Sequence, residues 1–285
     1  MSLKLFRFGE MGHEKPGVVS SSGKHLDVSA FGEDFNETFF QTDGIKRLST
    51  WLQGNESKCS EVASGFRFGS CVARPSKIIC IGLNYMKHAV ETGLGIPKEP
   101  IVFFKSTSSL GGPNDDIVIP KNSMKTDWEV ELAVIIGKKT SYIKEEDAAN
   151  HIAGYAVMND YSEREFQLER GGQWDKGKGC DTFGPLGPYM VSGPNLDPQN
   201  LRLWLKLNGE KLQDSNTADM IFKVYHIVSY VSQFMTLMPG DVISTGTPEG
   251  VGMGFKPPRY LKPGDVVELG IENLGEQKQK LVAHS

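Results

Sequence analysis

The fold is decided by the stretch Asp127-Trp128-Glu129-Val130-Glu131-Leu132-Ala133-Val134-Ile135-Ile136-Gly137. Successive side chains of a strand point to opposite faces, so Asp127, Glu129 and Glu131 are expected on one face. That face continues with Ala133 and Ile135, and the other face carries Trp128, Val130, Leu132, Val134 and Ile136. A strand that is apolar on both faces is expected to be buried on both sides.

Three acids that run into a buried strand repel one another and lose hydration. The cost is several kcal/mol for each uncompensated ion. The pattern therefore predicts a cation beside Asp127, Glu129 and Glu131, and a metal ion would satisfy it. The alternative is that residues 127–131 form the solvated end of an edge strand.

The composition is typical of a globular protein. The chain has 285 residues, of which 39% are hydrophobic, and its apolar runs all fall short of the length that spans a membrane. The first eight residues lack the pattern of a signal peptide, which predicts a cytoplasmic location. A net charge of -4, without a basic cluster, favours neither nucleic acid nor a membrane as partner. The four cysteines have no metal-binding or redox spacing and are interpreted as ordinary thiols.

Many short strands and few helices predict a mainly β, α+β fold with two domains. A small N-terminal domain is expected over residues 1–72 and a second domain over residues 73–285. Strands are predicted at 4–8, 17–20, 78–82, 101–105, 116–119, 152–160, 189–192, 201–207 and 210–213, and after turns within 239–245 and 263–269. Helices are predicted at 44–52, 85–91, 145–151 and, as one long amphipathic helix, at 218–237, and Asn84 is expected to be the N-cap of the helix at 85–91. Residues 171–179 are expected to be a mobile, irregular loop.

Several common motifs are absent from the sequence. The glycines of residues 250–254 are followed by Pro257 and Pro258, which cannot open the helix that a dinucleotide loop requires. There is no Walker sequence and no G-x-S-x-G elbow. The commonest nucleotide-binding and serine-hydrolase functions are therefore disfavoured.

Four segments carry the residues suited to chemistry. They are Asn84-Tyr85-Met86-Lys87-His88-Ala89-Val90-Glu91, Asp127-Trp128-Glu129-Val130-Glu131, Asn159-Asp160-Tyr161-Ser162-Glu163-Arg164-Glu165-Phe166-Gln167 and Thr245-Gly246-Thr247-Pro248-Glu249-Gly250-Val251. In this order they resemble the fumarylacetoacetate hydrolase family, over roughly residues 75–283. The resemblance implies a mixed β-sandwich roll and a homodimer.

The resemblance also implies a divalent metal ion held by Glu129, Glu131 and Asp160. All three are hard oxygen donors, which suits Mg²⁺, with Mn²⁺ or Ca²⁺ as other occupants. Taken alone, an acid in the position of Asp160 more often caps the segment after its strand.

His88 and Glu91 are three residues apart on the predicted helix, so they share one face. In the family such a pair is the general base, although on an arbitrary helix it is an ordinary surface pair. By the same resemblance, Lys178 is catalytic and Lys105 lies near the carboxylate or oxyanion of the substrate. The substrate contacts that it further implies are Arg164, Gln167 and Thr247, and for Arg164 a salt bridge that shapes the site is the alternative.

The function implied is hydrolysis of a carbon-carbon bond in 2,4-dioxo acids, which are acylpyruvates or 2,4-dioxo-3-deoxy sugar acids, to pyruvate and a carboxylic acid. Residues 166–188 resemble the branch that acts on sugar acids of the rhamnonate and fuconate pathways. Ureidoglycolate lyase, oxaloacetate decarboxylase and hydratase or isomerase activity remain alternatives. A non-catalytic, metal-dependent binder of organic acids would keep the three metal ligands without needing His88 and Glu91.

Overall fold

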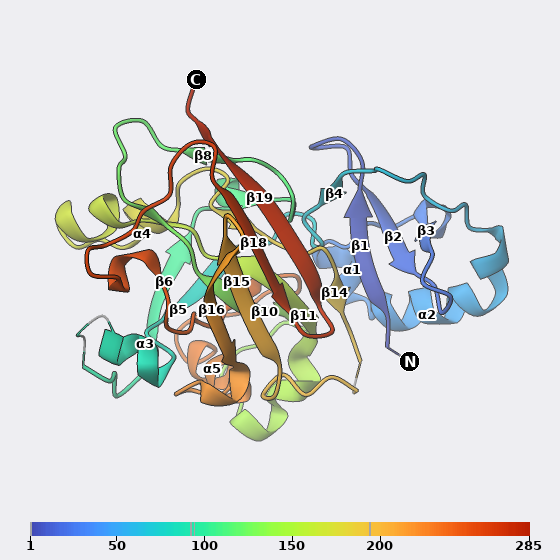
Figure 1. Ribbon diagram of the computed structural model, residues 1–285. Coiled ribbons are helices and arrows are strands. Elements are labelled where there is room, and N and C mark those ends of the chain that lie inside the picture. The colour runs from blue at the N-terminus through green and yellow to red at the C-terminus, as the bar shows by residue number, and fades with distance from the viewer. Residues whose placement is uncertain (1, 92, 94, 194) are drawn as a thin grey trace.

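Two β-sheets dominate the computed structural model, which describes residues 2–91, 93, 95–193 and 195–285 (Figure 1). In these residues the larger sheet has ten strands in the order β3-β2-β1-β14-β11-β10-β17-β5-β6, with β4 also paired to β1. Its strands are β1 (Lys4–Phe8), β2 (Lys15–Val19), β3 (His25–Asp27), β4 (Phe68–Gly69), β5 (Ile78–Gly82), β6 (Ile101–Lys105), β10 (Val130–Ile136), β11 (Ile152–Asn159), β14 (Met190–Val191) and β17 (Val242–Ser244).

The smaller sheet has five strands in the order β16-β15-β18-β19-β8. They are β8 (Ile117–Ile119), β15 (Arg202–Leu207), β16 (Glu210–Asn216), β18 (Val266–Ile271) and β19 (Gly275–Ala283). Two short pairs complete the strands, β7 (Leu110–Gly111) with β13 (Gly184–Pro185) and β9 (Thr126–Asp127) with β12 (Ser162–Glu163). The sheet-rich α+β fold predicted from the sequence is confirmed.

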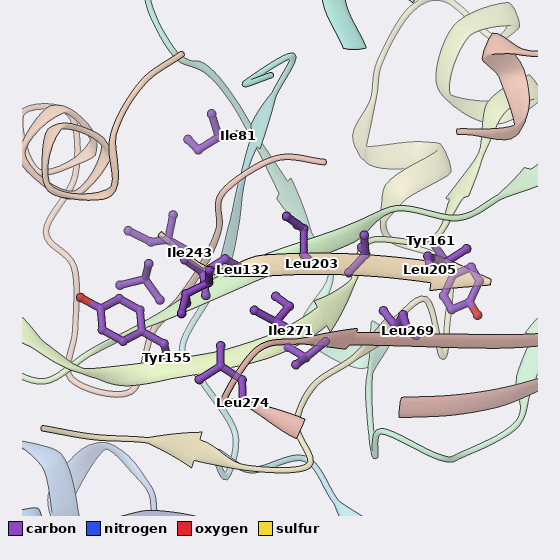
Figure 2. Packing of buried hydrophobic residues seen from close by; sticks show 14 of the residues in the cluster. Ile81, Leu132, Tyr155, Tyr161, Leu203, Leu205, Ile243, Leu269, Ile271 and Leu274 are labelled. Atoms are coloured by element: carbon purple, nitrogen blue, oxygen red, sulfur yellow. The ribbon is translucent and has the colours of Figure 1, made fainter. Parts of the chain in front are cut away.

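The central strand β10 lies between two hydrophobic clusters, as its alternating pattern predicts. Val130, Leu132, Val134 and Ile136 belong to the first cluster, which includes residues of the smaller sheet such as Leu203, Leu205 and Leu269 (Figure 2). Ala133 and Ile135 belong to the second cluster. Because β10 is packed on both faces, its first residues are held in a fixed position. Glu129 and Glu131 lie at this end of the strand.

The first 72 residues share one β-sheet and one hydrophobic cluster with the rest of the chain. Strand β1 pairs with β14, so the larger sheet continues across residue 72. Phe35, Phe39 and Leu48 share the second cluster with Ala133 and Ile135 of β10. The domain boundary between residues 72 and 73 therefore remains a prediction.

The helices of the described residues are short. The α-helices are α1 (Glu37–Gln41), α2 (Gly44–Asn55), α3 (Met86–Glu91), α4 (Asp175–Lys178) and α5 (Val224–Val231). Turns of 3₁₀-helix cover Ser29–Phe31, Glu56–Lys58, Thr107–Ser109, Glu145–His151, Thr217–Asp219 and Gly252–Gly254, and Glu165–Glu169 forms a π-helical turn. Within the described residues, every helix is too short or too polar to cross a membrane.

The expectation of one long helix over residues 218–237 is wrong, because the α-helix there, α5, covers only Val224–Val231. A 3₁₀ turn and a bend precede it, and the bend is held by Asn84, whose side-chain oxygen accepts a hydrogen bond from the Phe222 amide at 2.7 Å. The Asn84 amide group also donates to the carbonyl oxygens of Phe222 and Thr245. Asn84 therefore joins three segments instead of capping α3, as its position before that helix had suggested.

Two local expectations also need correction. Residues 171–179 are not irregular throughout, because α4 forms within them and buries Lys178. Strand Asp127–Gly137 is not continuous, because residues 128 and 129 separate β9 from β10. The Trp128 amide donates to the Asp127 side chain and the Glu129 amide donates to Asn159 Oδ1, so neither amide joins a regular ladder.

Candidate active site

Three buried carboxylates converge at the ends of the two central strands. Glu131 lies on β10, Glu129 precedes it, and Asp160 follows β11, which pairs antiparallel with β10. The Asp160 amide donates to the Glu129 carbonyl oxygen at 2.9 Å, which fixes the two segments against each other. One oxygen from each carboxylate lies within 4.8 Å of the others. The structure thus brings together the three residues predicted as metal ligands.

Two of these acids are balanced by buried cations. The Lys178 ammonium donates to Glu129 Oε2 at 2.5 Å and to Asp160 Oδ2 at 2.9 Å, and Lys105 donates to Asp160 Oδ1 at 2.5 Å. Arg164 Nη2 donates to Glu129 Oε1 at 2.7 Å. Burial opposes ionisation of Glu129, but the charges of Lys178 and Arg164 outweigh it and hold its pKa at about 2.

Glu131 has different surroundings. Its Oε2 atom accepts hydrogen bonds from the Ser244 hydroxyl at 2.6 Å and the Gly246 amide at 2.8 Å, which are neutral donors. Burial, reinforced by the charges of Asp160 and Glu129, raises the pKa of Glu131 well above its usual value. A buried carboxylate beside two others, all with hard oxygen donors, fits a divalent ion such as Mg²⁺, Mn²⁺ or Ca²⁺.

Asp127 does not join this cluster, although strand alternation had placed it on the same face. Its Oδ2 atom accepts a hydrogen bond from Arg164 Nε at 2.8 Å. The backbone amides of Gly252 and Met253 donate to the same carboxylate at 2.6 and 3.0 Å. The break at residues 128 and 129 explains the difference, because alternation holds only along an uninterrupted strand.

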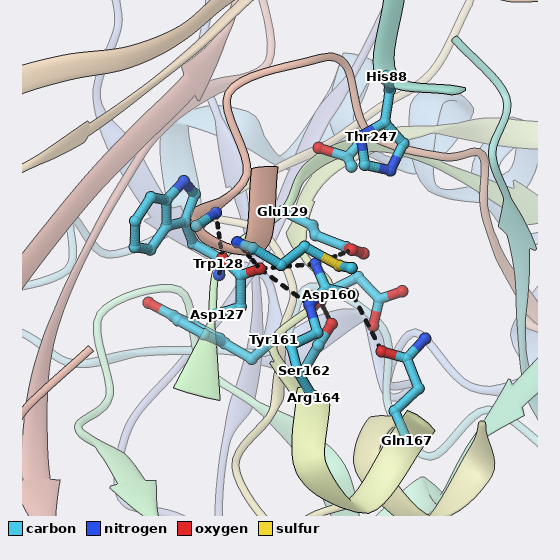
Figure 3. A network of polar contacts seen from close by, with 12 residues as sticks. His88, Asp127, Trp128, Glu129, Asp160, Tyr161, Ser162, Arg164, Gln167 and Thr247 are labelled. Atoms are coloured by element: carbon cyan, nitrogen blue, oxygen red, sulfur yellow. Dashed lines mark hydrogen bonds and ion pairs between the residues drawn. The ribbon is translucent and has the colours of Figure 1, made fainter. Parts of the chain in front are cut away.

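His88 and Glu91 lie together on α3, as their spacing predicts. His88 Nδ1 is 3.6 Å from Glu91 Oε2. The amide of Gly250 donates to both carboxylate oxygens of Glu91 at 3.1 Å, which orients that side chain from outside the helix. In the view of Figure 3, His88 lies above Glu129 and Gln167 lies below it.

One cavity of about 160 Å³ connects His88 to two of the three acids. Its wall includes His88, Glu129 and Glu131 together with Lys178 and Thr247. A small molecule in this cavity would therefore contact both the acid cluster and the imidazole.

The side chains expected to bind substrate are also close, and most already have protein partners. Arg164 Nη1 donates to Gln167 Oε1 at 3.0 Å, and the Thr247 hydroxyl donates to the Val130 carbonyl oxygen at 3.0 Å. Arg164, Gln167, Lys178 and Thr247 line the cavity. Lys105 is buried and outside the lining of this cavity, and besides Asp160 it donates to the Tyr161 carbonyl oxygen at 2.9 Å.

Sequence reasoning missed the residues that support this arrangement. Gln213 donates from Nε2 to the Thr247 hydroxyl at 2.9 Å and accepts at Oε1 from the Val130 amide at 3.1 Å. The Ser244 hydroxyl donates a hydrogen bond to Glu131, and the Gly250 amide donates one to Glu91. Gly250 lies in the last of the four segments that carry the resemblance, but its bond to Glu91 comes from the folded backbone and has no signal in the sequence.

Comparisons with known proteins agree on one family. Residues 77–282 match the family model described as fumarylacetoacetate (FAA) hydrolase C-terminal. A Burkholderia orbicola (strain MC0-3) protein named "Putative hydrolase" is 52% identical over 280 residues, which cover 98% of each chain. Fumarylacetoacetate hydrolase from Exiguobacterium antarcticum superposes with a TM-score of 0.85 at 33% identity, covering 99% of this chain and 100% of that one. Maleylpyruvate hydrolase from Sphingobium sp. SYK-6, solved with manganese(II) and pyruvate, gives a TM-score of 0.82 at 28% identity with the same coverage.

Proposed function

Because the chain belongs to the fumarylacetoacetate hydrolase family, we propose that it is a metal-dependent hydrolase that cleaves 2,4-dioxo acids into pyruvate and a carboxylic acid. The observation that carries the proposal is the shared cavity, which joins Glu129 and Glu131 to His88. An acid cluster alone would suit a binder of metal and organic acids. The imidazole, with its carboxylate partner, adds a group that can move a proton.

The three acids Glu129, Glu131 and Asp160 would hold the ion, and Mg²⁺ is the occupant that we propose, with Mn²⁺ or Ca²⁺ as alternatives. The manganese in the Sphingobium maleylpyruvate hydrolase supports a divalent ion in this fold. When bound, such an ion supplies Lewis-acid stabilisation of the negative charge that develops on the 2-oxo group.

The residues of this chain would carry the proton transfers. His88 takes a proton from a water molecule, whose oxygen adds to the C4 carbonyl carbon of the substrate. Glu91, fixed by the Gly250 amide, lies beside the imidazole and orients it. The C3–C4 bond then breaks, its electron pair stays on C3, and a proton completes the methyl group of pyruvate.

Lys178 would stabilise charge at the same end of the substrate. Its ammonium is buried between Glu129 and Asp160, so it can donate toward an oxyanion that forms beside these acids. Burial lowers the pKa of Lys178, but the charges of Asp160 and Glu129 outweigh it and raise the pKa above its ordinary value. We therefore assign Lys178 as a hydrogen-bond donor and not as a base.

The test is pyruvate release from a panel of dioxo acids by purified protein, with and without added Mg²⁺. Oxaloacetate and ureidoglycolate in the same panel separate decarboxylase and lyase activity from hydrolysis. Release of pyruvate together with a carboxylic acid is the expected result. A protein that binds these acids and converts none of them would be a binder, and the proposal would be wrong.

A further inference from the structure

We infer that the substrate carries a short, uncharged, apolar group at the end remote from its 2-oxo acid head. This inference rests on the proposed function for the identity of the head, and it assigns the rest of the molecule from the wall of the cavity. It distinguishes alkyl acylpyruvates from dicarboxylic and polyhydroxylated dioxo acids.

Two aromatic rings form one part of the wall. Phe103 of β6 and Trp174, which precedes α4, contact each other edge to face with their centroids 5.3 Å apart. Trp174 lies directly on the backbone of Gly82, because a Cβ atom there would be 2.6 Å from its ring. The absence of a side chain at residue 82 therefore lets the indole lie against β5, where it lines the cavity.

The rest of the apolar wall is aliphatic. It is formed by Ile81, Leu83, Leu168 and Met253. The cavity measures about 160 Å³. An apolar cavity of roughly 150 Å³ in another protein binds benzene, so the space here suits a compact head with a short alkyl substituent.

The cations of the cavity are already paired with its acids, although the Lys178 ammonium also lies 5.1 Å from the centroid of the Phe103 ring. Arg164 and Lys178 are the arginine and lysine side chains among the described residues that line it, and both contact Glu129. A carboxylate on the substrate that lies against Phe103 and Trp174 would lose hydration without gaining an ion pair. Burial of an unpaired charge is strongly unfavourable, so such substrates are selected against.

Hydroxyl groups on the substrate would also find few partners. Of the polar side chains in the cavity, Thr247 donates to the Val130 carbonyl oxygen and accepts from Gln213. Gln167 accepts from Arg164 through its oxygen, which leaves its amide group for the substrate. This wall suits an alkyl chain better than the sugar acids suggested by the resemblance of residues 166–188.

The first experiment measures binding without turnover. 2-Oxohexanoate and 2-oxohexanedioate have the same number of carbons and differ only in a terminal methyl or carboxylate, and neither has the C4 carbonyl that would be cleaved. Calorimetry with the full-length protein in Mg²⁺ should give at least tenfold tighter binding for 2-oxohexanoate. Equal binding, or tighter binding of the diacid, would overturn the inference whether or not the protein hydrolyses dioxo acids.

The second experiment measures turnover on three acylpyruvates of equal chain length, carrying butanoyl, dihydroxybutanoyl or succinyl groups. We expect kcat/KM to be highest for butanoyl, lower by roughly 10- to 100-fold for the hydroxylated chain, and lowest for succinyl. A preference for either polar chain would overturn the inference and leave the proposed hydrolysis intact. If none of the three releases pyruvate, the proposed function fails, and the binding comparison still decides the inference.

A variant pair then tests the wall itself. Leu168 is partly exposed at 43%, so a longer polar side chain can be accommodated there. Leu168→Arg should raise the ratio of kcat/KM for succinyl to that for butanoyl substrate by about tenfold, because it supplies the missing cation. Leu168→Gln, which is polar but neutral, serves as the matched control and should not raise this ratio. A ratio that is unchanged in Leu168→Arg, or raised equally in both variants, would contradict the assignment of this wall to the remote group.

Discussion

The carboxylate of Asp127 accepts a hydrogen bond from Arg164 at 2.8 Å. This contact links the acid cluster to the loop that orients Glu91. Arg164 continues from there to Glu129, among the predicted metal ligands. The same carboxylate holds the amides of Gly252 and Met253, in the loop whose Gly250 amide orients Glu91. Asp127 is therefore a positioning residue for both the acid cluster and the proposed base.

Asp127→Asn should destabilise the protein, because it leaves the buried Arg164 guanidinium with one carboxylate fewer. Removal of one partner from a buried ion pair costs about 3 kcal/mol of the free energy of unfolding or more. Urea unfolding measures this cost, and hydrogen exchange at Gly252 and Met253 should become faster.

The control for this variant is Asp214→Asn, which weakens the surface pairs of Asp214 with Arg202 and Lys211. A surface pair contributes less than about 1 kcal/mol. Equal losses of stability in the two variants would show that Asp127 is no more important than a surface acid.

The sequence predicted those parts of the site that depend on local spacing. The alternation from Val130 to Ile136 gave the two buried faces of β10, and the interval between His88 and Glu91 gave their contact on α3. Both follow from the geometry of a single element, so no tertiary information was needed.

The sequence did not predict features that arise from contacts between distant segments. Asn84 resembled a helix cap, but its side chain bonds to Phe222 and Thr245, more than a hundred residues away. Those bonds hold the chain in a bend at Phe222, so α5 begins only at Val224. The role of Asp127 was hidden for the same reason, because its partners Arg164 and Gly252 come from two other parts of the chain.

Metal should stabilise the folded protein as well as activate it. A divalent ion that binds the folded acids, and not the unfolded chain, raises the unfolding temperature with its concentration. Chelator-treated protein should lose activity and regain it with Mg²⁺ or Mn²⁺, and its unfolding temperature should rise in parallel. A monovalent salt at equal ionic strength is the control, and full activity in demonstrably metal-free protein would end the metal-dependent interpretation.

The thiols should react slowly in the folded protein. Burial raises the pKa of Cys71 to about 12 and that of Cys180 to about 11, and it also raises the pKa of Cys59 and Cys80. Because the thiolate is the reactive form, a disulfide reagent at pH 8 should label native protein slowly and all four cysteines after unfolding.

The raised pKa values of the thiols also determine the direction in which stability changes with pH. Thiols of the unfolded chain ionise near their ordinary pKa, whereas Cys71 stays protonated in the folded state up to about pH 12. The free energy of unfolding should therefore decrease as the pH rises above the ordinary thiol range. Cys71→Ala should make this decrease shallower, and an identical pH profile in this variant would contradict the assignment.

A homodimer is expected in solution. Strands β6 and β3 end the larger sheet, and β16 and β8 end the smaller one, so each sheet has edges that another copy could cover. Light scattering at micromolar concentration should give twice the chain mass of 31.4 kDa. A mass near that of one chain would contradict the expectation.

The last prediction separates the work of the acids from the work of the imidazole. Glu131→Ala removes a predicted metal ligand, so it should weaken Mg²⁺ binding in calorimetry and abolish hydrolysis. His88→Ala removes the proposed base from α3, so it should leave Mg²⁺ affinity nearly unchanged and lower hydrolysis by roughly 10²- to 10⁴-fold. Decarboxylation of oxaloacetate requires no activated water and should survive in His88→Ala. If both variants lose Mg²⁺ to the same degree, or if His88→Ala hydrolyses a dioxo acid at the parent rate, His88 and Glu91 are not the pair that activates water.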